Sequence, residues 1–168
     1  MRISSLVVFA LLATFAFGFL DGCGGSASQR ADLIADLRGY GDGIRWRDFN
    51  AAALRVQPTK REAFMDDREQ LEDDLRVADW ELRRLTYDAS RNHAEVHIEW
   101  TWMLDSRGIV HNTVSRQLWS RFGKQWIMMR EERLRGDRMP GIAEPRKPRR
   151  KTPESKPEPA LSATSPRG

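Results

Sequence analysis

Four polar side chains in the second half of the chain are of the types that carry acid–base chemistry or bind metal ions. Glu95, His97 and Glu99 alternate with apolar residues, and His111 lies further along the chain. A buried carboxylate–imidazole pair can transfer protons, and two carboxylates with an imidazole can bind zinc. The same spacing is also that of the solvated face of an amphipathic strand, which is the interpretation we favour.

Three of the six tryptophans, Trp46, Trp100 and Trp102, are candidates for the lining of an apolar ligand pocket. Indole rings tolerate half-buried positions because their N–H can find a partner at the pocket edge. Packing within the core is the competing and favoured interpretation. The sequence holds no Gly-rich phosphate loop, serine nucleophile motif or HExxH motif, so we expect neither a cofactor nor a metal ion.

The single cysteine, Cys23, has the most specific predicted chemistry. One thiol excludes an intrachain disulfide and thiolate-built zinc or iron–sulfur sites. Cys23 closely follows an apolar run over residues 3–20 that Arg2 precedes, which is the arrangement of a signal peptide. The alternatives are an uncleaved membrane-spanning helix and cleavage by a conventional peptidase near residues 16–18 or 26–28.

The residues that lead up to the cysteine resemble the lipobox of bacterial lipoproteins: Leu20, Asp21, Gly22 and Cys23. Asp21 departs from that pattern, because a small or aliphatic residue is usual there. The resemblance implies that residues 1–22 are removed and that Cys23 receives a diacylglyceryl thioether and an N-acyl chain such as palmitate. Two or more chains give a stable membrane anchor. By the family's sorting tendency, Gly24 favours the outer membrane, on its periplasmic side.

The net charge of the chain comes from its C-terminal part. Residues 141–168 carry seven basic and three acidic side chains, which account for the whole formal charge of +4, and hold six of the eight prolines. A neutral domain with a basic tail argues against a nucleic-acid partner. The composition predicts a disordered tail over residues 139–168. Its basic cluster, residues 146–151, is either a solvating segment or a contact for envelope polyanions.

The first half of the domain has the apolar spacing of helices. Three helices are predicted: about 31–38, 44–54 and 60–75. After the first predicted helix, three glycines weaken the helical pattern: Gly39, Gly41 and Gly43. Trp46 and Phe49 are expected to face inward from the second helix. Thr59, followed by Glu62, fits a capping box at the start of the third.

The second half of the domain changes to the two-residue period of strands. Four strands are predicted: about 80–87, 94–104, 109–122 and 125–134. Strict alternation over the second strand is the strongest signal in the chain. Opposite parities at the two ends of the first strand predict a bulge near Arg83 and Arg84.

Two hairpin registers follow from the turns. A three-residue loop with a left-handed Gly108 pairs Trp100 with Val114 and keeps apolar residues on one face, and we prefer it for that reason. A two-residue loop, which pairs Trp100 with Thr113, is the alternative. The last hairpin turns at residues 123–124 and would pair Arg116 with Glu131.

Helices followed by an antiparallel meander define an α+β domain with helices on one sheet face. The pattern resembles the nuclear transport factor 2-like superfamily, which includes ketosteroid isomerase-like enzymes, dehydratases and many non-catalytic binding domains. The residues that carry the resemblance are Leu37, Tyr40, 44–49, Ala52, Pro58, Arg61, Phe64, 117–119 and 123–126. It implies a curved, cone-like sheet over residues 31–138, with 23–30 as a tether, and a possible homodimer through the exposed sheet face.

These observations predict a membrane-anchored envelope lipoprotein whose domain binds a small apolar ligand or a protein partner without catalysis. One alternative is an enzyme of the isomerase or dehydratase type that uses His97 or His111 with Glu95 or Glu99. Placement of His97 and Glu99 on the outer sheet face would remove this alternative. Another is a scaffold whose basic tail contacts envelope polyanions.

Overall fold

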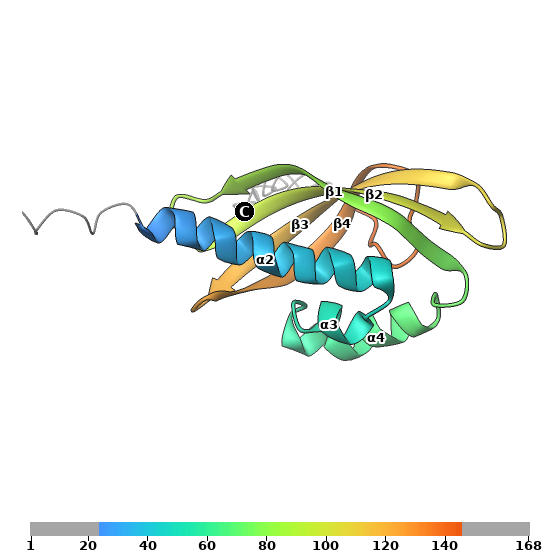
Figure 1. The fold of residues 1–168 in the computed structure, drawn as a ribbon, viewed down its shortest axis with the longest axis horizontal. Helices are drawn as coiled ribbons and strands as arrows, with labels where there is room; N and C mark the ends of the chain where they lie inside the picture. The colour runs from blue at the N-terminus through green and yellow to red at the C-terminus, as the bar shows by residue number, and fades with distance from the viewer. Residues whose placement is uncertain (1–23, 146–168) are drawn as a thin grey trace, which may run out of the picture.

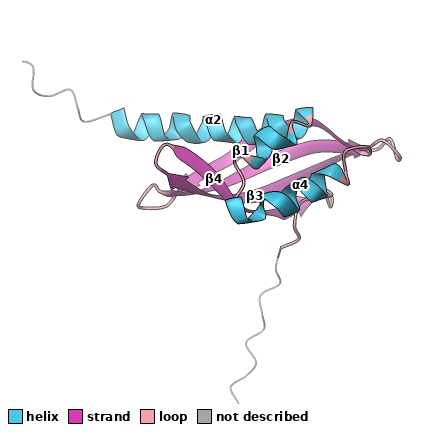
Figure 2. Cartoon of the chain, turned by 90° about the horizontal axis from the view of Figure 1, so that it is seen from below, coloured by secondary structure: helices cyan, strands magenta, loops and turns pink. Residues whose placement is uncertain are grey.

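The computed structural model describes residues 24–145, which form a helical layer against one antiparallel sheet (Figures 1 and 2). The helical elements are α2 (Gly24–Trp46), α3 (Phe49–Ala53), the 3-10 turn η1 (Pro58–Lys60) and α4 (Arg61–Glu69). The strands are β1 (Leu75–Tyr87), β2 (His93–Leu104), β3 (Val110–Phe122) and β4 (Gln125–Gly136), in the order β1-β2-β3-β4. The predicted α+β class and four-stranded meander are confirmed.

Helix α2 runs lengthwise along the sheet, whereas α3 and α4 lie near one end of it (Figure 1). The buried face of α2 repeats at helical spacing through Leu33, Leu37, Tyr40 and Ile44. It packs against the apolar face of β2, which alternates as predicted: Ala94, Val96, Ile98, Trp100 and Trp102 are all buried. Residues 24–30, which the sequence analysis treats as a tether, form the first turns of this helix.

The glycines of α2 do not loosen the helix, contrary to the sequence expectation. They allow neighbouring groups to approach its backbone closely. A Cβ at Gly41 would lie 2.4 Å from the Trp80 indole, and one at Gly43 would lie 2.9 Å from the backbone of Ala52. Close packing on both sides therefore outweighs the cost of about 1 kcal/mol per helical glycine.

The break in the helical region falls at Arg47, later than predicted. Arg47 has a positive φ of 60°, and Asp48 then caps α3 by accepting a 3.0 Å hydrogen bond from the backbone N–H of Ala51. Trp46 stands at this corner with 72% of its surface exposed, so the expectation that it faces inward is wrong.

The third predicted helix is shorter than expected, because α4 ends at Glu69 and β1 already begins at Leu75. Thr59 lies inside η1, and α4 has no side-chain cap, so the predicted capping box does not form.

The preferred register of the β2–β3 hairpin is wrong, and the alternative is found. Trp100 pairs with Thr113, and Glu99 pairs with Val114. Gly108 is left-handed as predicted, with a φ of 64°, but its turn spans four residues between Leu104 and Ile109. The inner face of β3 is therefore polar in composition and carries Thr113, Ser115 and Gln117, all fully buried.

Bulges in the two edge strands, β1 and β4, determine which of their residues face the core. The predicted bulge in β1 is confirmed between Leu82 and Arg84, and a second lies at Ala78. In β4 an extra residue, Met129, interrupts the pairing with β3. Arg116 consequently pairs with Glu132 instead of Glu131, and Glu131 pairs with Gln117 on the inner face.

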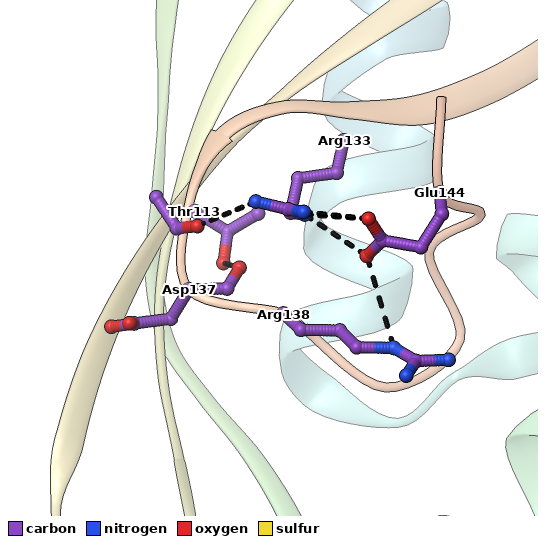
Figure 3. Close-up of polar contacts among 6 residues, drawn as sticks. Thr113, Arg133, Asp137, Arg138 and Glu144 are labelled. Atoms are coloured by element: carbon purple, nitrogen blue, oxygen red, sulfur yellow. Dashed lines mark hydrogen bonds and ion pairs between the residues drawn. The ribbon is translucent and has the colours of Figure 1, made fainter. Parts of the chain in front are cut away.

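The domain extends past residue 138, where the predicted tail begins. Met139 and Ile142 are buried, and Ala143 bridges to Glu132 of β4. Arg133 reaches across to this segment and holds Glu144 at 2.6 Å, with Arg138 on the other side of the same carboxylate (Figure 3). We call residues 139–145 the C-terminal strap.

Within residues 24–145, no helix combines the length and the apolar composition needed to cross a membrane.

Candidate ligand-binding site

The polar residues on the inner face of β3 are partners for buried tryptophans. The indole N–H of Trp102 donates to Thr113 Oγ1, that of Trp100 to Ser115 Oγ, and that of Trp119 to Gln117 Oε1. Each of these distances is 2.9 Å. A buried indole N–H without a partner costs about 1–3 kcal/mol, so these three polar neighbours stabilise the burial of Trp100, Trp102 and Trp119.

Glu131 collects hydrogen bonds from this face. Its Oε2 accepts from the Tyr40 hydroxyl at 2.6 Å. Its Oε1 accepts from Ser115 Oγ at 2.7 Å, Gln117 Nε2 at 2.9 Å and Trp100 Nε1 at 3.3 Å. Four uncharged donors from α2, β2 and β3 therefore converge on one carboxylate of β4.

Tyr40 links this network to the helices. Burial raises the pKa of its hydroxyl well above the usual value, the charge of Glu131 raises it further, and Arg68 partly opposes the rise. Tyr40 therefore stays protonated and remains a donor to Glu131 at neutral pH. Its ring also packs edge-on against Trp100 and Trp119, with centroids 6.2 Å away in each case.

A cavity of about 490 Å³ lies between α4, β4 and the C-terminal strap. Its size falls within the range of small-molecule sites. Tyr40 and Glu131 line it, and the ammonium of Lys60 donates to the Met129 carbonyl at 2.7 Å. Apolar parts of the wall come from Val56, Ala63, Phe64, Met128 and Met129, and further charged groups from Asp67, Arg68, Arg130 and Glu144.

Arg68 is the most buried cation of the cavity wall, with 3% of its surface exposed. Its Nη2 donates to the Gly141 carbonyl of the strap at 3.2 Å, and its guanidinium carbon lies 5.2 Å from the centroid of the Phe64 ring. Its Nε and Nη1 are buried and have no hydrogen-bond partner in the described part of the chain. Among residues 24–145, no carboxylate lies within ion-pair distance of Arg68.

The strap that closes one side of the cavity is itself held by charges. The hydrogen bond from Arg133 lowers the pKa of Glu144. This carboxylate therefore stays ionised, and paired with Arg133, at lower pH than a free glutamate would. Gly141 has a positive φ of 77°, and a Cβ there would lie 2.7 Å from Arg68 Nη1. Glycine is therefore favoured at this point, because other residues rarely adopt such a positive φ.

The structure brings two of the three predicted pocket tryptophans together and excludes the third. Trp100 and Trp102 are buried side chains of the β2 inner face, whereas Trp46 is exposed. None of the three lines the cavity. Trp100 nevertheless contacts it indirectly, through its hydrogen bond to Glu131.

The predicted acid–base residues are not in the cavity. Glu95, His97 and Glu99 lie on the outer sheet face, where His97 Nε2 is 2.9 Å from Glu95 and Glu99 accepts from Arg83 at 2.6 Å. His111 lies on the opposite face, because it pairs with Trp102 and stacks on its ring at 4.6 Å. The preferred register, which pairs Trp100 with Val114, would put all four on one face, whereas the observed register separates His111 from the other three.

The enzyme alternative, which uses His97 or His111 with Glu95 or Glu99, is therefore wrong, because none of these residues lies in the cavity. Within the part of the chain that the structure describes, no group of three or more His, Cys, Asp or Glu side chains is arranged to hold a metal ion. Cys23, the signal-peptide alternatives and the basic cluster at 146–151 all lie outside the described residues.

Sequence reasoning missed Glu131 and Arg68 as site residues. It named Tyr40 only as part of the family resemblance. One signal was available for the inner face: Trp119 shares its parity with Gln117, Ser115 and Thr113. A buried Trp119 therefore places these polar residues inside with it.

No family model matches the sequence, and no curated protein matches it. Several solved structures have a similar arrangement. A SEC-C motif containing protein from Rhodopseudomonas palustris is 10% identical, with a TM-score of 0.48 over 63% of this chain and 88% of that one. A conserved protein from Planctomyces limnophilus is 12% identical, with a TM-score of 0.49 over 62% and 94%.

A third solved structure is described as an NTF-2-like protein of unknown function from Shewanella oneidensis. It is 14% identical, with a TM-score of 0.46 over 62% of this chain and 97% of that one. At these identities and TM-scores, the similarities support no statement on activity or ligand.

Proposed function

We propose that this chain is a membrane-anchored lipoprotein of the bacterial cell envelope whose nuclear transport factor 2-like domain binds a small ligand, without catalysis, in the cavity between α4, β4 and the C-terminal strap. The observation that carries the binding function is the cavity of about 490 Å³ with Arg68 and Glu131 in its wall. The lipobox-like residues around Cys23 support the anchor and a location on the periplasmic side of the outer membrane.

The absence of catalysis in this proposal rests on how Glu131 is held. A carboxylate has about four acceptor positions, and four protein donors already point at Glu131. A carboxylate so engaged organises its surroundings and offers few free acceptor positions to a ligand. Tyr40, the other titratable group of the network, is held in its protonated form.

The anchor and the binding domain would lie close together. Helix α2 begins at Gly24, the residue that follows Cys23. An acylated Cys23 would therefore join the lipid to a helix of the domain without an intervening flexible linker. A domain held in this way is suited to take up a ligand close to the bilayer surface.

The anchor is tested by replacing Cys23 with serine in the full chain. We expect the variant to lose the mass of the acyl chains and to leave the membrane fraction, because serine lacks the thiol that forms the thioether to the lipid. A matched Ser26→Ala variant should keep both properties. If the Cys23→Ser protein still partitions with membranes at unchanged mass, the lipoprotein proposal is wrong.

The binding function is tested by native mass spectrometry of the purified full chain. We expect a co-purified small molecule on the wild-type protein and its loss from an Ala63→Trp variant, because Ala63 lies exposed in the cavity wall and an indole there fills the space. An Ala78→Trp variant, exposed at the β1 bulge, is the control and should keep the ligand. Equal retention in all three proteins would place the ligand elsewhere.

A further inference from the structure

Two charged residues of the cavity wall, Glu131 and Arg68, differ in how far their hydrogen-bonding groups are satisfied. Glu131 receives four hydrogen bonds, whereas the Arg68 guanidinium, with five N–H groups, donates one, to the Gly141 carbonyl, and lies near enough to the Tyr40 hydroxyl to lower its pKa. Within the described residues, Nε and Nη1 of Arg68 are buried without a hydrogen-bond partner. Unpaired buried charge is costly, so a site that retains it is one where an incoming group can supply the missing acceptor.

We propose that the ligand of this cavity is a small carboxylate, whose carboxylate group binds Arg68. This inference rests on the proposed ligand-binding function and specifies its substrate class. A carboxylate matches the planar guanidinium with two parallel hydrogen bonds, which a single carbonyl cannot do. The ligand oxygens take the place of the Gly141 carbonyl at Nη2 and satisfy the neighbouring Nη1.

The other charges of the wall are compatible with an incoming anion. Glu144 is engaged by Arg133, and Asp67 is exposed to water at the rim. Lys60, also at the rim, has only a backbone carbonyl as partner. Four uncharged donors stabilise the Glu131 carboxylate, and one of them, the Tyr40 hydroxyl, occupies its Oε2.

The remaining wall defines the rest of the ligand. Val56, Phe64 and Met128 offer apolar surface beside the charged groups. A site of this size and composition suits a monocarboxylate with an aromatic ring or a short hydrocarbon chain. The strap residue Gly141 covers the guanidinium with its backbone, so the ligand displaces this backbone when it binds.

The test compares three probes of one shape on the full-length protein in non-ionic detergent: 3-phenylpropanoate, 3-phenylpropan-1-ol and 3-phenylpropylamine. Dissociation constants are measured by calorimetry. Because a hydrogen bond between charged partners exceeds a neutral one, we expect the carboxylate to bind at least about tenfold more tightly than the alcohol and the amine. This comparison needs no variant and cannot fail through misfolding.

Variants then locate the preference. In Arg68→Met the carboxylate should lose its advantage over the alcohol, whereas Arg45→Met, which removes a guanidinium distant from the cavity wall, should keep it. Equal affinities for the three probes, or an undiminished preference in a folded Arg68→Met protein, would overturn the inference while leaving a ligand-binding cavity intact. Failure of all three probes to bind would overturn both this inference and the proposed binding function.

Discussion

Glu131 and Glu132 are adjacent in β4 but lie on opposite faces of the sheet, and the two faces hold a carboxylate in different ways. Glu132, with 3% of its surface exposed, forms ion pairs with Arg116 and Arg130, whose side chains are themselves 39% and 38% exposed. Glu131 has no cation within ion-pair distance among the described residues and is held by four uncharged donors. Water can rehydrate the outer arginines, whereas the inner donors are mostly enclosed.

The difference separates a structural carboxylate from one that shapes a site. On the outer face, the charge of Glu132 is neutralised locally by two arginines. On the inner face, the donors stabilise Glu131 but leave its charge, and that of Arg68, without a partner of opposite sign. The cavity lies beside this second arrangement.

The largest effect is expected from Glu131→Ala. The donors of Tyr40, Gln117 and Ser115 lose their common acceptor, and we expect the free energy of unfolding to fall by about 3 kcal/mol. Urea unfolding monitored by tryptophan fluorescence measures this change. An equal loss of unfolding free energy in Glu132→Ala would contradict the difference between the two faces.

Tyr40→Phe should have the next largest effect, because it removes one hydrogen bond to a charged group and costs about 1.5–3 kcal/mol at neutral pH. The folded-state pKa of Tyr40 is raised, so its contribution is complete below the unfolded value of about 10 and is lost as pH rises through the folded value. The stability difference between wild type and Tyr40→Phe should therefore shrink above about pH 10.

Tyr87, whose pKa burial also raises, is present in both proteins and cancels from that difference. At neutral pH a Tyr87→Phe variant is the matched control for the lost hydrogen bond, since the Tyr87 hydroxyl has no hydrogen-bond partner within the described residues. Parallel pH profiles for wild type and Tyr40→Phe, measured by urea unfolding from pH 7 to pH 11, would contradict the assignment.

Glu132→Ala should have the smallest effect, about 1 kcal/mol, because Arg116 and Arg130 can turn to water. Part of that loss should disappear between about 0.05 and 1 M NaCl, because salt screens partly exposed pairs. The effect of Glu131→Ala should change little over the same range. Equal salt dependence for the two variants would show that the two faces do not differ as described.

The sequence predicts the inner face of β2 because every inward residue there is apolar and every outward residue except Met103 is polar. It fails on β3, where the inner face combines Trp119 with Thr113, Ser115 and Gln117. A rule that groups apolar residues on one face chooses Val114 and Leu118 instead. The observed register gives the indole N–H groups of Trp100, Trp102 and Trp119 a buried acceptor each.

Other features depend on contacts that sequence spacing does not encode. The bulge at Met129 turns Glu131 inward, and a regular pairing would have left it on the outer face opposite Arg116. The glycines of α2 are helical because Trp80 and Ala52 pack against them. Arg68 is charged by type, and its buried guanidinium is held by a hydrogen bond to the C-terminal strap.

The most direct test of the binding site uses the indole N–H resonances of the tryptophans, assigned through single Trp→Phe variants. During a titration with 3-phenylpropanoate, we expect the Trp100 resonance to shift and saturate, because its N–H donates to Glu131 in the cavity wall. Trp46, exposed and outside the cavity wall, should not respond. An unchanged Trp100 resonance, or a larger shift at Trp46, would contradict the assignment of this cavity as the ligand site.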